Sequence, residues 1–74
     1  MMEEQDAKDR QFQIEHLTQE LVSMLIDDRD MTMEQALDTV YRSHTYEKIE
    51  KASTGLYYQS AVYVMDMLEE ELGL

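Results

Sequence analysis

The two histidines are the side chains best suited to chemistry in this sequence. Glu20 follows His16 by four residues, a spacing that places both side chains on one face of a helix. An imidazole beside a carboxylate is half of a metal site or of a general-base pair, but the only further imidazole is His44. We therefore expect His16 to be solvated. We expect His44 to lie at the C-terminal end of a helix, where the helix dipole favours its cationic form.

Nucleophilic catalysis would require a serine held near a histidine and an acid. Ser43, His44 and Thr45 supply suitable residue types, but as neighbours in the sequence their side chains diverge instead of converging on one oxygen. We interpret this segment as the stop of one helix and the cap of the next.

Three other chemical motifs are incomplete. Asp28, Asp30, Thr32 and Glu34 place oxygen-bearing side chains at every second position, as in a calcium loop. However, Met33 stands where that loop needs Gly, and Thr39 stands where it needs a bidentate Glu. Gly55 and Gly73 are the only glycines, which excludes a Gly-rich phosphate loop. The chain has no cysteine and therefore no thiolate ligand or nucleophile. We predict no catalytic residue, no cofactor and no metal site.

The charge balance indicates which partners the chain can bind. Acidic residues outnumber basic residues 17 to 6, which gives a formal net charge of −11. Lys and Arg supply most of the affinity for phosphates, so we expect no direct contact with nucleic acid or with anionic membranes. No apolar run is long enough for a membrane span, and the first residues are acidic, unlike a secretory signal. We expect a cytoplasmic protein, and the charge would attract a basic protein partner.

Apolar spacing predicts two helices in the first half of the chain. From residue 9 to residue 28 apolar residues recur every three or four positions, which predicts one long helix. Thr32 and Gln35 have the spacing of a capping box and predict the start of a second helix, which ends near Arg42. The apolar stripe of this second helix consists of Met33, Ala36, Leu37, Val40 and Tyr41.

The second half of the chain predicts a short helix from Thr45 to Ala52 and a final helix capped by Ser60. The intervening residues 56–58 are β-prone but have no strand to pair with, so we expect an extended connector whose aromatic rings cover the core. The final helix has an apolar stripe, with three further apolar residues partly outside it. The stripe is Ala61, Val62, Met65, Leu68 and Leu72, and the others are Tyr63, Val64 and Met67. The negative charges of glutamates 69–71 are unfavourable at the C-terminal end of this helix. We expect solvation or a basic group from another subunit to offset this repulsion.

These elements predict an all-α fold, a small bundle of three to four helices: one long N-terminal helix, two short helices and one C-terminal helix. Residues 1–8 form either a frayed N-terminus or a first helical turn, and residues 9–74 form a single helical domain. A chain of 74 residues buries only about 60% of the surface that it exposes when unfolded. We therefore expect oligomerisation to complete the bundle, with a homodimer favoured.

Several segments resemble a family of very short bacterial proteins of unknown function. They are Met33–Tyr41 (MEQALDTVY), Ser43, Thr45–Ile49 (TYEKI), Thr54–Tyr57 (TGLY) and Gln59 with Ser60. In that family the pattern EALxxxYxSxTYxKLxxxxTGLYxQS precedes a final helix. This chain differs at Gln35 and Ile49, and has Ala61 where Pro would also fit. The resemblance implies an all-helical cytoplasmic protein and, since some such families neighbour toxin-like genes, an antitoxin-like role. It assigns no site residue.

Large, adaptable side chains are the main functional signal. The chain has seven Met and five Tyr, residue types that are enriched at protein interfaces. We assign Met65 to the core, and we take Tyr58, Tyr63 and Met67 as candidate interface residues whose alternative is the edge of the core. These features predict a small non-enzymatic protein–protein interaction or regulatory module. The alternative is a subunit whose ligand or catalytic site forms only at an oligomer interface, with His16 or the tyrosines.

Overall fold

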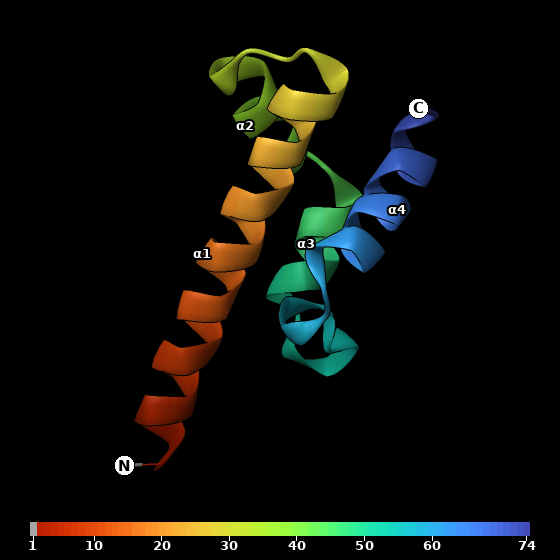
Figure 1. The fold of residues 1–74 in the computed structure, drawn as a ribbon. Coiled ribbons are helices and arrows are strands. Elements are labelled where there is room, and N and C mark those ends of the chain that lie inside the picture. Colours follow the sequence, from red (N-terminus) through yellow and green to blue (C-terminus); the bar gives the residue numbers. More distant parts are fainter. Residues whose placement is uncertain (1) are drawn as a thin grey trace.

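Helices account for most of the chain (Figure 1). The computed structural model describes the backbone of residues 2–74 and the side chains from Lys8 onward. Its elements are α1 (Met2–Arg29), α2 (Met33–Tyr41), α3 (His44–Glu50), the 3-10 turns η1 (Ala52–Thr54) and η2 (Leu56–Tyr58), and α4 (Ala61–Leu72). Residues 2–74 contain no strand, which confirms the prediction of a small all-α bundle with one long, two short and one C-terminal helix. Met1 and the side chains of residues 2–7 lie outside the described part, and the frayed N-terminus stays a prediction.

Helix α1 sets the shape of the molecule. Its 28 residues span about 42 Å at the usual helical rise, which matches the longest dimension of 43 Å against 20 and 19 Å for the other two. The remaining elements pack against its C-terminal two thirds, so its N-terminal end extends past them (Figure 1). The helix stops at Arg29, and Asp30 takes a left-handed conformation with φ 54° that reverses the chain.

Side-chain caps fix where the shorter helices begin. Thr32 Oγ1 accepts from the backbone N–H of Gln35 at 3.1 Å, and the N–H of Thr32 donates to Gln35 Oε1 at 2.9 Å, so the predicted capping box is confirmed. Ser43 and Ser60 accept from the N–H of the residue three positions later and begin α3 and α4. In each cap, the side chain and the backbone N–H that it binds lie within four consecutive residues.

Three local predictions were wrong. His44 is the first residue of α3 instead of the end of α2, because Ser43 is the cap of α3. The helix also ends at Glu50, before the predicted Ala52. Residues 56–58 form a 3-10 turn instead of an extended connector. Gly55, with φ 68°, turns the chain into this 3-10 conformation, and its carbonyl accepts from the N–H of Tyr58.

The core lies between α1 and the other three helices. It comprises Ile14, Leu17, Leu21, Val22, Leu25, Ala36, Val40, Ile49, Leu56, Val64, Met65 and Leu68. In α4 the predicted stripe was partly wrong, because Val62 is exposed and Val64 is buried. Helix α4 packs against both α1 and α3. Its buried face is therefore wide enough to include the sequence neighbours Val64 and Met65, which a single apolar stripe would not. Met65 is buried, as predicted.

Candidate functional site

The three predicted interface residues differ in exposure. Tyr58 in η2 and Tyr63 in α4 keep 63% and 52% of their surface exposed. Met67 is partly buried and packs against the core. Tyr58 and Tyr63 are therefore accessible to a partner, whereas Met67 lies at the edge of the core.

The predicted apolar stripe of α2 is divided between core and surface. Ala36 and Val40 are buried, but Met33, Leu37 and Tyr41 are 60%, 38% and 53% exposed. The three exposed residues are spaced by four and therefore form one row along the helix. Periodicity identified this stripe in the sequence, but it could not distinguish the side covered by α1 from the side left open.

The exposed row borders a groove between α1 and α2, which we call the α1–α2 groove. It has a volume of about 580 Å³ and is lined by Glu15, Thr18, Gln19, Val22 and Ser23 of α1 and by Met33, Leu37 and Tyr41 of α2. Val22 and Thr18 are buried, and the Thr18 hydroxyl donates to the carbonyl of Ile14 at 2.7 Å. The Thr18 hydroxyl is thus hydrogen-bonded within α1. From α2 the groove is lined by the apolar side chains of Met33 and Leu37, with the phenol of Tyr41 at one end.

Tyr46 supports the tyrosine end of this groove. The rings of Tyr41 and Tyr46 meet edge to face with centroids 4.9 Å apart. Burial raises the pKa of Tyr46, and the charge of Glu50 raises it further, so this phenol stays neutral. The aromatic contact restricts the orientation of Tyr41 at the groove.

A second, smaller surface lies where α1 meets η2. It has a volume of about 190 Å³, and Phe12, Leu17, Tyr57 and Tyr58 contribute most of its apolar side chains. His16 also lines it, exposed and paired through Nε2 with Glu20 Oε1 at 2.8 Å, as the helical spacing predicts. Among the described residues, no three His, Asp or Glu side chains gather in a way that could hold a metal ion.

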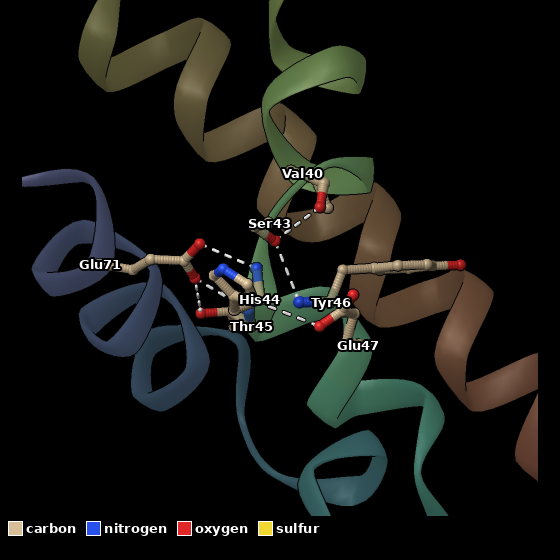
Figure 2. Close-up of polar contacts among 7 residues, drawn as sticks. All are labelled: Val40, Ser43, His44, Thr45, Tyr46, Glu47 and Glu71. Carbon is tan, nitrogen blue, oxygen red and sulfur yellow. Dashed lines mark hydrogen bonds and ion pairs between the residues drawn. The ribbon is translucent and has the colours of Figure 1, made fainter.

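The polar segment around His44 is organised by Glu71 of α4 (Figure 2). The N–H of His44 donates to Glu71 Oε2 at 2.8 Å, and the N–H and Oγ1 of Thr45 donate to Glu71 Oε1 at 2.8 and 2.7 Å. Ser43 Oγ is buried and engaged elsewhere, donating to the carbonyl of Val40 at 2.6 Å and accepting from the N–H of Tyr46 at 3.0 Å. Ser43 is therefore committed to capping α3.

At the acidic end of α4, Glu71 accepts hydrogen bonds from α3 in place of the solvation that we expected. Burial alone would raise the pKa of Glu71, but hydrogen bonds from the Thr45 hydroxyl and the backbone of His44 and Thr45 outweigh it and lower the pKa. The carboxylate thus stabilises the positive end of α3. Glu69 in the same turn pairs with Arg29 of α1. Both contacts join residues far apart in the chain, so no local signal predicts them.

None of the helices within residues 2–74 combines the length and hydropathy that crossing a bilayer requires. Comparisons with protein-family models, with curated proteins and with solved structures each gave no match. The fold and its surfaces define a small all-helical protein with exposed apolar grooves. The resemblance to short bacterial proteins is carried by the sequence pattern alone and stays a prediction.

Proposed function

We propose that this protein is a small non-enzymatic interaction or regulatory module that binds another protein through exposed apolar side chains. The observation that supports this most directly is the number of large apolar residues left open on so small a bundle. They are Phe12, Met33, Leu37, Tyr41, Tyr58, Val62, Tyr63, Leu72 and Leu74. Aromatic residues and Met are enriched at protein interfaces, and Tyr is among the residue types that contribute most of the free energy of binding.

The charge and size of the chain support two kinds of partner. The net charge of −11 favours a basic protein, whose approach the field accelerates. Self-association, with a dimer favoured, would cover apolar surface that 74 residues cannot bury alone. Tyr58, Tyr63 and the edge residue Met67 are the side chains that we assign to such an interface. An antitoxin-like role in a bacterial cytoplasm is the finer proposal, and it rests on the sequence resemblance.

The alternative function is a ligand or catalytic site completed by a second subunit. The observation that favours it is the exposed His16–Glu20 pair beside Tyr57 and Tyr58. A second copy placed there would supply the further groups that one chain lacks. A polar cavity that two subunits share and that contains His16 would favour this alternative over the interaction module.

Affinity capture with the tagged chain from its native cell, combined with light scattering on the purified protein, tests the proposed function. We expect a specific protein partner or a defined oligomer. Replacing exposed Tyr63 with Gln should weaken the association, whereas replacing exposed Ser53 with Ala serves as a control outside the predicted interface and outside the α1–α2 groove. If capture recovers no protein and the purified chain is a monomer, the interaction module is refuted.

A further inference from the structure

We propose that the α1–α2 groove binds a basic amphipathic helix of another protein. This inference rests on the proposed function and names the surface and the chemistry of its partner. The groove is the larger of the two apolar surfaces, about 580 Å³ against about 190 Å³ at the Phe12–Tyr58 surface. In helix-in-groove recognition the apolar face of an amphipathic helix packs against apolar side chains of a groove. Here Val22, Met33 and Leu37 supply apolar contact surface, and Glu15 adds a negative charge to the lining.

The dimensions of the groove suit a helix. Met33, Leu37 and Tyr41 extend over all nine residues of α2, and the helical rise separates the first from the last by about 12 Å. Apolar anchors at positions i, i+3 or i+4, and i+7 of a partner helix span about 10.5 Å by the same rise. Val22, buried between the walls, forms the floor that such anchors would contact. The exposed row of α2 therefore has the length for about two turns of a bound helix.

Acidic residues lie on both helices that form the groove. Glu15 of α1 lines it directly. Glu34 and Asp38 of α2 lie outside the groove lining, on the neighbouring surface that they share with Thr32 and Gln35. Arg42 Nε pairs with Asp38 Oδ1 at 2.9 Å, whereas Glu34 makes no ion pair within residues 8–74. Lys and Arg on the flanks of a bound helix would meet these carboxylates at the rim of the interface.

A second copy of this chain does not have the required chemistry. Each copy carries a net charge of −11, so two acidic rims would face each other. The Lys and Arg residues are dispersed among acids, as in α3, where Lys48 lies beside Glu47 and Glu50. A dimer through Tyr58 and Tyr63 would instead involve η2 and α4. The groove is therefore assigned to a different, basic protein.

Nuclear magnetic resonance titration with synthetic helical peptides tests the assignment. The probe is a Leu/Lys peptide with Leu on one face. The controls are the same peptide with Glu in place of Lys and a scrambled Leu/Lys peptide without an apolar face. We expect the probe to shift backbone signals of Thr18, Val22, Met33 and Leu37, with an affinity that falls as salt is added. The proposal is overturned if the scrambled or the Leu/Glu peptide binds equally well, or if the shifted signals lie in η2 and α4.

Two matched double variants separate the groove from the rest of the surface. M33Q/L37Q removes two apolar side chains of the groove without changing the charge, and V62Q/L72Q removes two exposed apolar side chains of α4 that lie outside the groove. We expect M33Q/L37Q to weaken probe binding by at least about tenfold and V62Q/L72Q by less than about twofold. Circular dichroism verifies that both remain helical. Since Leu37 is the less exposed of the two groove residues, M33Q alone provides a second variant with little risk to folding. Equal weakening by both double variants overturns the groove assignment.

Native capture distinguishes failure of this inference from failure of the proposed function. If wild type and M33Q/L37Q recover the same protein equally, the interaction module stands and the groove assignment is overturned. If M33Q/L37Q converts a wild-type dimer to a monomer, a second copy occupies the groove and the assignment is likewise overturned. If the wild type captures nothing and does not bind the probe, both proposals fail.

Discussion

The contact between Glu71 and the start of α3 allows a sharp test of how this fold is stabilised. Glu71→Gln preserves the size of the side chain and one acceptor oxygen, so both hydrogen bonds from Thr45 to Oε1 can persist. At the other position an amide NH2 replaces Oε2, which accepts from the N–H of His44 at 2.8 Å. Two donors then face each other, and the negative charge at the N-terminal end of α3 is lost.

The expected loss follows from three contributions. One unmade hydrogen bond costs about 0.5–1.5 kcal/mol, and the lost charge at a helix N-terminus costs about 0.3–1 kcal/mol. Removing a negative charge from the C-terminal end of α4 returns a few tenths, about 0.3 kcal/mol, and solvent screening of the exposed carboxylate reduces the charge contribution further. We expect Glu71→Gln to lower the free energy of unfolding by about 1 kcal/mol, or the Tm by roughly 4–8 °C for a domain of this size.

The pH dependence gives an independent check on the charge. Although burial opposes ionisation, the hydrogen bonds to Glu71 lower its pKa in the folded protein. A lowered folded pKa contributes stability above the ordinary glutamate pKa, and that contribution is lost as the pH falls through the folded pKa. The stability difference between wild type and Glu71→Gln should therefore be largest at neutral pH and shrink in acid.

Urea unfolding followed by circular dichroism measures these differences. Glu70→Gln is the matched control, because the Glu70 carboxylate makes no hydrogen bond or ion pair within residues 8–74. The reasoning is refuted if Glu71→Gln and Glu70→Gln have equal stability at neutral pH. It is also refuted if the effect of Glu71→Gln does not change between neutral and acidic pH.

Three further substitutions test local and core contributions by the same unfolding measurement. Thr32→Ala removes the capping box of α2 and should cost about 1 kcal/mol; an unchanged stability would contradict the cap. Leu21→Ala empties a fully buried site and should cost about 2–5 kcal/mol; a cost below that range would indicate that the core collapses around the site. Gly55→Ala should cost about 1–2 kcal/mol from its left-handed backbone, and the exposed Tyr58 side chain must move, because the new Cβ would lie 2.7 Å from its hydroxyl. Gly73→Ala, with φ 73° and open space, is its control and should cost less.

Exposure was the weakest part of the sequence prediction for the candidate site. Met33, Leu37 and Tyr41 were correctly placed on one apolar face with Ala36 and Val40, yet only the last two are buried. An apolar stripe shows which residues share a face, but its covered width depends on the angle and distance at which the neighbouring helix packs. The α1–α2 groove therefore emerged only from the packed structure.

The sequence by itself determined that this protein is helical and which segments contain caps. Thr32, Ser43 and Ser60 begin helices through hydrogen bonds that span three residues, and apolar spacing alone identified the long helix. The tertiary structure decided the relations between elements: Val64 instead of Val62 in the core, and Glu71 bound to a backbone 26 and 27 residues earlier. Capping and periodicity depend on near neighbours in the chain, whereas burial and long-range hydrogen bonds depend on which helices meet and at what angle.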